Sequence, residues 1–280
     1  MNFTWNDGPE GASSAAPLGP GGWLRVIARG GVLAGVLVSG VVLMLMMRGV
    51  ERPLFGLGRP WTPHITQWVC RAAFVILGMR HETRGQPMQA HGGVVANHSS
   101  WLDIFALNAR KRIYFVSKSE VAGWPGIGTL ARITGTVFIN RTPKEAKAQR
   151  DMFEARLKAG HKLLFFPEGT STDGMRVLPF KSTLFQAFFS HNIIHDLHIQ
   201  PVTVIYHAPP GQDARFYGWW GDMEFGTHLL KTLAARRQGK VTVLYHPPVR
   251  VDAFPDRKAL AGHVEEVVRA AMPEERRAAG

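Results

Sequence analysis

The chain has 280 residues, of which 45% are hydrophobic, and a formal net charge of +12 at pH 7. This length accommodates one full domain with additions, and the composition can fill a sizeable core. The basic excess suits an anionic membrane surface or an acidic protein. No basic run interleaved with aromatic residues forms a recognisable nucleic-acid module, so we expect no nucleic-acid partner. Cys70 is the single cysteine and lies in an apolar segment, which excludes an intrachain disulfide and makes it a poor nucleophile.

The N-terminal part begins with a tail and an apolar segment. Residues 1–22 are rich in Gly, Pro, Ala and Ser, and we expect a disordered tail there. Residues 30–47 carry no charge and are long enough to span a bilayer. A cleaved signal peptide is the alternative, but the tail is long and no Ala-x-Ala-like site follows, so we favour a retained anchor. Arginines flank both ends, so the orientation stays open, and a re-entrant or interfacial hairpin is an alternative to a true span.

A second apolar segment covers residues 65–79 and is interrupted by Arg71. It is too short for a confident span. Trp61, Trp68 and Phe74 suggest a helix at the membrane interface, and an ordinary helix packed on the main domain is the alternative. We therefore expect membrane-anchoring helices over residues 23–79 and a separate α/β domain over residues 80–280.

Short apolar runs alternate with helical patterns across this domain. Strands are predicted at residues 80–84, 93–96, 113–116, 135–141, 163–166, 199–206 and 241–245. Helices are predicted after residue 98, up to residue 132, and at residues 142–159, 183–189, 227–237 and 259–271. This alternation predicts an α/β fold with a mixed, largely parallel sheet flanked by helices.

The motif Asn-His-Ser-Ser-Trp-Leu-Asp at residues 97–103 follows the second predicted strand. His98 therefore lies where a strand gives way to a helix, and Ser99 or Ser100 can cap that helix. Asp103 comes about one turn into the helix, where its carboxylate can accept a hydrogen bond from one imidazole nitrogen. The other nitrogen is then free to act as a general base, so we predict His98 and Asp103 as catalytic residues.

The spacing alone is weak, because His191 and Asp196 repeat it and we interpret that pair as accidental. The first pair is supported by Phe-Pro-Glu-Gly-Thr at residues 166–170, which also follows a predicted strand. The two motifs in this order resemble the glycerolipid acyltransferase family, whose bacterial prototype is 1-acyl-glycerol-3-phosphate acyltransferase. The resemblance covers about residues 80–206.

The resemblance implies a membrane-bound enzyme that moves a fatty acyl chain from acyl-CoA or acyl carrier protein to the free hydroxyl of a lysolipid. The default acceptor is 1-acyl-glycerol-3-phosphate, which would give phosphatidic acid. No cofactor is expected beyond the acyl donor, which is a substrate. The inner membrane, with the catalytic domain on the cytoplasmic face, is the expected location because acyl donors are made there.

The resemblance also implies substrate-binding residues. Glu168, Gly169 and Thr170 are expected to contact the acceptor. Arg141, at the end of a predicted strand, is the best phosphate ligand, and Lys118 could add a second positive charge. The alternative for both cations is a solvated surface charge.

One departure from the family's pattern bears on the acceptor. The family often has arginine directly after the threonine, and this chain has Ser171 there. One expected positive charge is missing, which puts specificity for glycerol phosphate in doubt. Another lysolipid, such as lyso-ornithine lipid, is therefore an alternative acceptor.

Other site types are less favoured. Ser99 and Ser100 are interpreted as helix caps and not as nucleophiles, because a thioester is already activated for direct attack. His191, His195 and His198 have a spacing that could ligate a metal, but no supporting carboxylate motif accompanies them, so no metal is expected.

Two rival classes remain. One is a membrane-anchored lipid-binding protein with a degenerate site, against which the intact motifs argue. The other is a lipid hydrolase that uses His98 to activate water. Such hydrolases usually show a nucleophile elbow or a metal set, and neither pattern is present in the sequence.

Overall fold

The structure, a computed structural model, describes residues 18–140, 146–189 and 194–277. Its α-helices are α1 (Pro20–Phe55), α2 (Thr62–Leu77), α3 (Asp103–Arg110), α4 (Ile127–Thr134), α5 (Ala146–Lys158), α6 (Phe225–Ala234) and α7 (Arg257–Ala270). Its strands are β1 (Arg80–Arg84), β2 (Gly92–Ala96), β3 (Tyr114–Lys118), β4 (Val137–Ile139), β5 (Leu163–Phe165), β6 (His198–His207), β7 (Lys240–Tyr245) and β8 (Val249–Arg250). Short 3₁₀ helices lie at Ser119–Gly123, Ser182–Phe189, Ile194–Asp196, Val251–Ala253 and Glu274–Arg276.

The strands form one sheet in the order β1-β7-β6-β2-β5-β3-β4, and β8 pairs with β6. All neighbours on this path are parallel except β6 and β7, and β8 is also antiparallel to β6. The predicted fold class, a mixed and largely parallel sheet flanked by helices, is therefore confirmed. The parallel run β6-β2-β5-β3-β4 brings the carboxyl ends of its five strands to one edge of the sheet.

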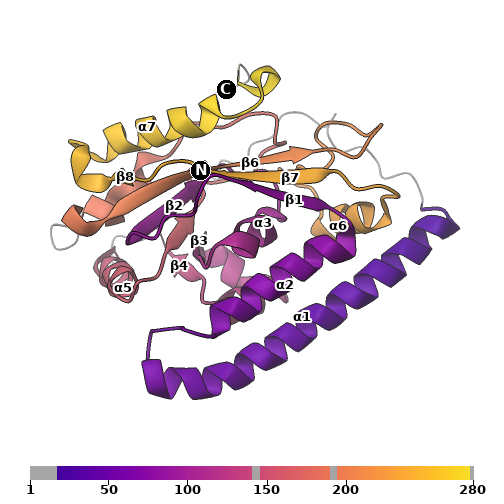
Figure 1. The fold of residues 1–280 in the computed structure, drawn as a ribbon, viewed down its shortest axis with the longest axis horizontal. Coiled ribbons are helices and arrows are strands. Elements are labelled where there is room, and N and C mark those ends of the chain that lie inside the picture. Colours follow the sequence, from indigo (N-terminus) through magenta and orange to yellow (C-terminus); the bar gives the residue numbers. More distant parts are fainter. Residues whose placement is uncertain (1–17, 141–145, 190–193, 278–280) are drawn as a thin grey trace.

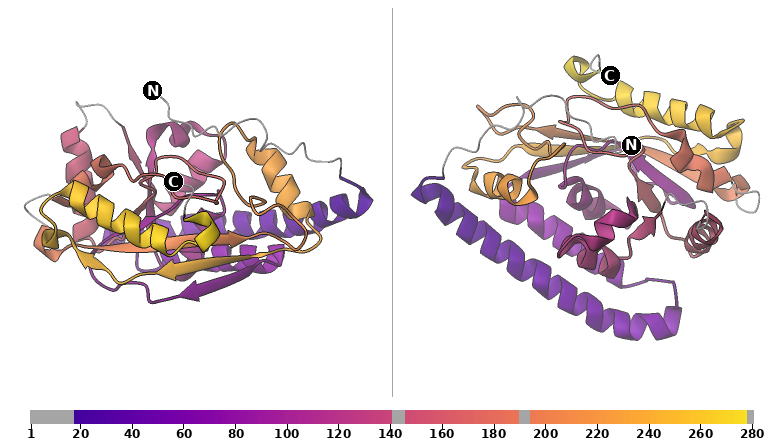
Figure 2. Two further views of the ribbon diagram at one scale, coloured as in Figure 1. Left: turned by 90° about the horizontal axis from the view of Figure 1, so that it is seen from above. Right: turned by 180° about the vertical axis from the view of Figure 1, so that it is seen from behind.

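Helices cover both faces of the sheet. In Figure 1 and in the right view of Figure 2, α7 lies on one side while α1, α2 and α3 lie on the other. Successive residues of a buried strand point to opposite faces. Val94 accordingly packs into the core beneath α2 and α3, and Val95 packs into the core beneath α7. Both layers are apolar, so β2 is buried along its whole length, as expected for a central parallel strand.

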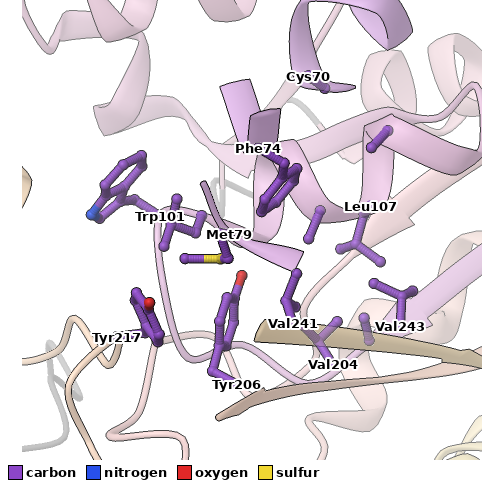
Figure 3. Packing of buried hydrophobic residues seen from close by; sticks show 14 of the residues in the cluster. Cys70, Phe74, Met79, Trp101, Leu107, Val204, Tyr206, Tyr217, Val241 and Val243 are labelled. Atoms are coloured by element: carbon purple, nitrogen blue, oxygen red, sulfur yellow. The ribbon is translucent and has the colours of Figure 1, made fainter. Parts of the chain in front are cut away.

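Figure 3 shows the core on the α2 and α3 side, where Phe74 and Leu107 face valines of the strands. Phe74 is 3% exposed, whereas Trp68 is 54% exposed and Trp61 is 39% exposed. The expectation that all three aromatic residues lie at an interface is therefore wrong for Phe74, which packs in the core. Arg71, which interrupts the apolar pattern of α2, has a structural role. Its Nε donates to the carbonyl of Ala109 at the end of α3 (2.7 Å).

The N-terminal apolar segment is one continuous helix. It begins at Pro20, so the last three residues of the stretch expected as a tail are helical, while residues 1–17 lie outside the described part. By length and composition α1 could cross a membrane, and only 17% of its most apolar stretch is buried, which suggests membrane association. Such a helix near an N-terminus is weak evidence for a span.

Helix α2 packs side by side with part of the longer helix α1 (Figure 1). At their contact, a Cβ on Gly40 would lie 2.5 Å from a methyl group of Val69, so only glycine fits at this position. At the start of α1, Arg25 donates to the carbonyl of Ala234, and Arg29 donates to those of Leu233 and Ala235. These two arginines cap the C-terminus of α6.

Candidate active site

The predicted catalytic histidine lies at the carboxyl edge of the sheet. His98 comes two residues after β2, and Glu168 comes three residues after β5, the neighbour of β2. Lys118 is the last residue of β3, which pairs with β5 on its other side. Ligands of open α/β sheets bind in the crevice at this edge. The topology therefore gathers residues that are far apart in the sequence.

His98 and Asp103 form the predicted pair. The Nδ1 atom of His98 lies 2.7 Å from Oδ2 of Asp103. Because an ionised carboxylate only accepts hydrogen bonds, Nδ1 carries the proton and Nε2 is left with a free lone pair. The His98 side chain is 19% exposed, whereas Asp103 is fully buried. The buried Asp103 carboxylate thus orients the imidazole, and the ring is accessible from solvent on its other side.

The local structure of the motif differs from the prediction in one respect. Asp103 is the first residue of α3 and not one turn inside it. Its Oδ2 also accepts hydrogen bonds from the backbone amides of Ser99 (2.9 Å) and Ser100 (3.0 Å). The aspartate therefore closes the turn that the serines were expected to cap. The same oxygen holds the imidazole and the turn, so the histidine is fixed relative to its own backbone.

The flanking motif residues attach this turn to neighbouring strands. The Asn97 side chain donates to the carbonyl of Val204 (2.9 Å) and accepts from its amide (2.8 Å), which ties the turn to β6. The Oε1 atom of Glu168 accepts from the amide of His98 (2.6 Å), and its Oε2 accepts from the amide of Leu178 (2.8 Å). Both carboxylate oxygens of Glu168 thus bind backbone, and the residue is 2% exposed.

The environment of Glu168 perturbs its protonation. Burial raises the pKa of this carboxyl to about 8, while the hydrogen bonds from Leu178 and His98 oppose the rise. Asp103 adds to the rise because it is a second negative charge nearby. The sequence prediction that Glu168 contacts the acceptor is not tested by this geometry. In the structure, the carboxyl group of Glu168 joins the two motifs through its hydrogen bond with the backbone amide of His98.

An aromatic wall completes the surroundings of the imidazole. The His98 ring stacks on Phe166 with a centroid distance of 4.0 Å and an interplanar angle of 10°. Phe166 in turn stacks on Phe115 of β3 at 5.9 Å. This apolar face restricts the rotation of the imidazole and leaves its edge as the polar part of the site.

The other predicted binding residues occupy the same edge where they are described. Gly169 has a φ of 75°, and a Cβ added there would lie 2.6 Å from Nζ of Lys181, so Lys181 covers the Glu-Gly-Thr turn. Thr170 is partly exposed, and Lys118 is exposed at the end of its strand. Arg141 lies outside the described residues. The acceptor-binding roles of these residues remain predictions.

Several supporting residues escaped the sequence analysis. The amide of Trp219 donates to the carbonyl of Ser99 (2.8 Å), and the amide of Thr172 donates to the carbonyl of His98 (3.0 Å). The hydroxyl of Tyr206 lies by Asp103, and burial together with that negative charge raises the pKa of this phenol well above its usual value. These contacts join residues far apart in the sequence, so no local sequence pattern predicts them. Among these residues, Trp219 alone belongs to a conspicuous sequence feature, the aromatic stretch Phe-Tyr-Gly-Trp-Trp at residues 216–220.

The Trp101 side chain links the motif to α6. Its Nε1 donates to Nδ1 of His228 (2.9 Å), so Nδ1 of this buried histidine acts as an acceptor. Burial and, to a smaller extent, the nearby Lys231 lower the pKa of His228 to about 4. A neutral His228 is therefore part of the folded structure at neutral pH.

The less favoured candidates lie elsewhere. His195 binds Asp252 through Nδ1 (3.1 Å), and His191 lies outside the described residues. Within the described ranges no group of three or more His, Cys, Asp or Glu residues is placed to hold a metal ion. Cys70 is buried, and burial raises the pKa of its thiol to about 12.

A solvent-accessible imidazole oriented by a buried carboxylate, at the carboxyl edge of a largely parallel sheet, defines a general-base site on an α/β fold. Residues 80–205 match the family model described as Acyltransferase. The chain is 60% identical over 248 residues to the lyso-ornithine lipid O-acyltransferase of Rhodobacter capsulatus. The aligned region covers 89% of this chain and 90% of that protein. The chain therefore belongs to the acyltransferase family, and the resemblance found from its motifs is confirmed.

Two further similarities are more distant. The chain is 31% identical over 198 residues to a 1-acyl-sn-glycerol-3-phosphate acyltransferase of Neisseria gonorrhoeae, over 68% of this chain and 74% of that protein. The crystal structure of the 1-acyl-sn-glycerophosphate (LPA) acyltransferase from Thermotoga maritima superposes with a TM-score of 0.57. It covers 87% of this chain and 94% of that one at 22% identity, so this similarity concerns the fold alone.

Proposed function

We propose that this protein is a lyso-ornithine lipid O-acyltransferase. The observation that carries the chemistry is the pair of His98 and Asp103, with 2.7 Å between Nδ1 and Oδ2 and an accessible imidazole. The acceptor follows from the relatives: identity is 60% to an enzyme named for lyso-ornithine lipid and 31% to one named for 1-acyl-sn-glycerol-3-phosphate. The acceptor that the sequence analysis kept as an alternative is therefore the one we now favour.

In the proposed reaction His98 is the general base. Its Nε2 takes the proton from the free hydroxyl of the lysolipid as that oxygen attacks the carbonyl carbon of the acyl thioester. The new C–O bond forms, the C–S bond breaks, and the thiolate leaves with the proton that the imidazolium returns. Asp103 stabilises the imidazolium and fixes its orientation, and such positioned proton transfer contributes about 10²- to 10⁴-fold in rate. No nucleophilic side chain is required, because the thioester is already activated.

The ornithine head group is consistent with Ser171, which stands where the family often has arginine. Ornithine carries a carboxylate and amines but no phosphate, so a site for it needs less concentrated positive charge than a phosphate site. Ser171 replaces the arginine that the family often has there, which agrees with this difference. We keep Lys118, Thr170 and Arg141 as proposed acceptor contacts, and we propose Glu168 as a positioning residue because both its oxygens bind backbone.

A donor and acceptor matrix tests this proposal. Purified full-length protein is given acyl-CoA or acyl carrier protein thioester with lyso-ornithine lipid, 1-acyl-glycerol-3-phosphate or a zwitterionic lysophospholipid, and thiol release is measured. We expect preferred, His98-dependent turnover on lyso-ornithine lipid, with His98→Ala as control. Faster turnover on 1-acyl-glycerol-3-phosphate would show that this lipid, the acceptor first expected from the sequence, is the preferred substrate. Turnover that survives His98→Ala would overturn the mechanism.

We further propose that α1 lies along the membrane surface beside α2, with the catalytic domain on the cytoplasmic face. The helix is about 54 Å long at 1.5 Å per residue, against a hydrocarbon core of about 30 Å. Yet Arg25 and Arg29 hold its start to α6, and Glu51 accepts from Trp61 and Thr62 near its end. A helix held to α6 at its start and to the beginning of α2 near its end supports the interfacial alternative over a span.

Single-cysteine labelling in sealed inner-membrane vesicles distinguishes the two arrangements. Cysteines placed on a Cys70→Ser background at Leu24 and Leu54, near the two ends of α1, should both react with a membrane-impermeant maleimide from the cytoplasmic side. Protection of one end only would show that α1 spans the bilayer.

A further inference from the structure

A second polar cluster lies at the opposite, amino edge of the sheet. Tyr114 is the first residue of β3, and His161 precedes β5. The guanidinium of Arg156 lies 4.7 Å from the centroid of the Tyr114 ring, that of Arg59 lies 5.9 Å from it, and the His161 ring stacks on it at 4.2 Å. The cluster thus joins the α1–α2 connection, the end of α5 and the start of two strands.

The positive charges of this cluster are not balanced. Arg59 donates to the carbonyl of Ile133 and Arg156 donates to that of Gly135, but within the described residues neither forms an ion pair with a carboxylate. The Nε atoms of both arginines are buried there without a hydrogen-bond partner. Glu51, whose negative charge acts on Arg59, already binds Arg48 at 3.1 Å.

This arrangement is electrostatically unfavourable. Burial and the neighbouring charge of Arg59 lower the pKa of Arg156 to about 10. Burial and both arginines also lower the pKa of His161 to about 4. Removing like charges from water side by side is unfavourable unless an anion joins them, and the planar fork of guanidinium matches phosphate oxygens.

The surroundings indicate where such an anion comes from. A shallow, open recess lies on the Arg59 side of the cluster, lined by Arg59 and Tyr114 and by threonine side chains of α2 and around the end of α4. The α1–α2 connection beside it exposes large apolar side chains: Leu54 is 64% exposed, Phe55 47% and Leu57 51%. Apolar side chains next to basic ones are typical of a surface that contacts lipid.

We propose that Arg59 and Arg156 form a binding site for the phosphate group of an anionic membrane phospholipid, separate from the catalytic edge. The lipid phosphate would bind the two guanidinium groups at the Tyr114 ring, next to the recess that Arg59 lines, while the exposed apolar residues of the α1–α2 connection contact its acyl chains. The enzyme would then hold a lipid that it does not acylate. This inference goes beyond the proposed reaction and does not depend on it.

Lipid affinity of the full-length protein in detergent tests the site. Dioctanoyl phosphatidylglycerol is titrated by calorimetry into the wild type and into the double variant Arg59→Gln/Arg156→Gln. Each arginine near a lipid phosphate contributes about fivefold, so we expect the double variant to bind about 30-fold more weakly. The matched control, Arg257→Gln/Lys258→Gln, removes the same charge from the exposed start of α7 and should bind like the wild type.

Two more arms define the ligand. Inorganic phosphate and octanoate should both bind much more weakly than the phospholipid. Equal affinity for inorganic phosphate would overturn the lipid assignment, and equal affinity for octanoate would overturn the phosphate assignment. Should the glutamine variant fail to fold, Arg59→Lys/Arg156→Lys keeps the charge and removes the fork, and we expect partial loss. Wild-type affinity in either variant would refute the site, and turnover is not used as the readout, so such a failure leaves the proposed reaction untouched.

Discussion

The two edges of the sheet carry polar clusters that differ in how their charges are satisfied. At the carboxyl edge, Oδ2 of Asp103 accepts three hydrogen bonds, and Glu168 uses both oxygens on backbone amides. At the amino edge, Arg59 and Arg156 lie together, and within the described residues no carboxylate pairs with them. The hydrogen bonds to Oδ2 of Asp103 and to Glu168 hold one imidazole in a fixed geometry, as chemistry requires. An unbalanced pair of cations suits the binding of an external anion.

The largest expected effect is a loss of turnover in Asp103→Asn, which separates the catalytic role of the carboxyl edge from lipid binding at the amino edge. Asp103→Asn replaces an acceptor of three hydrogen bonds by an amide that cannot favour the required imidazole tautomer. We expect kcat to fall by about 10²- to 10⁴-fold, while phosphatidylglycerol affinity stays unchanged because that site is at the other edge. Steady-state kinetics and calorimetry on the same preparation check this. A fall in both quantities would show that the two edges are not independent.

The next effect concerns the link between the motifs. Glu168→Gln keeps one acceptor for the amides of His98 and Leu178, and Glu168→Ala keeps none. Each buried amide left without a partner costs roughly 1–3 kcal/mol, so the alanine variant should lose about twice as much unfolding free energy as the glutamine variant. Denaturant titration measures both. Equal losses would argue against two separate amide contacts.

Glu168 also predicts a pH dependence of stability. Its folded pKa, about 8, lies above its ordinary value of 4.5, so the folded state binds more protons between these values. Its contribution to stability is full below about pH 4.5 and is lost as the pH rises towards 8. Comparison of wild type and Glu168→Gln from pH 5 to 8 isolates this slope, and parallel curves would exclude it.

His228 should give a slope of the opposite sign. Its folded pKa, about 4, lies below its ordinary value of 6.5, so its contribution is present above pH 6.5 and is lost as the pH falls towards 4. The difference between wild type and His228→Gln should change by about 1–3 kcal/mol over this range. His161 shifts in the same direction, so only that difference, and not the wild-type curve, tests His228.

The smallest effect is expected at Tyr206. Its hydroxyl lies by Asp103, and Tyr206→Phe removes one polar neighbour while it keeps the ring that packs in the core (Figure 3). A neutral hydrogen-bonding group of this kind contributes about 0.5–1.5 kcal/mol, so we expect kcat to fall about 2- to 10-fold. An effect as large as that of Asp103→Asn would make Tyr206 a central residue of the site.

The sequence predicted the parts of the site that are local. His98 and Asp103 are five residues apart, and both positions are dictated by one strand-to-helix turn. The parallel sheet followed from alternating apolar runs, because each buried strand shows a distinct pattern. Even here the prediction placed Asp103 a turn too late, since the short turn between Asn97 and Ser100 has no periodicity from which the start of α3 could be located.

What the sequence could not supply is long-range. The contact between Asn97 and Val204 spans 107 residues, and the contact between Trp101 and His228 spans 127. Helix α1 extends past its apolar stretch to Phe55 because Glu51 and Arg48 make contacts beyond the helix, which hydropathy does not register. The pair of Arg59 and Arg156 has no motif at all, since nothing in the sequence indicates that two arginines 97 positions apart share one tyrosine.

The arginines at the start of α1 have a practical consequence for protein engineering. Deleting the apolar helix is an obvious way to obtain a soluble version of such an enzyme. Here that deletion would leave the carbonyls of Leu233, Ala234 and Ala235 without their caps. Because α6 carries His228, which binds the tryptophan of the catalytic motif, the damage would extend into the active site. A soluble version therefore requires redesign of the outward face of α1, with its first three turns kept so that Arg25 and Arg29 remain.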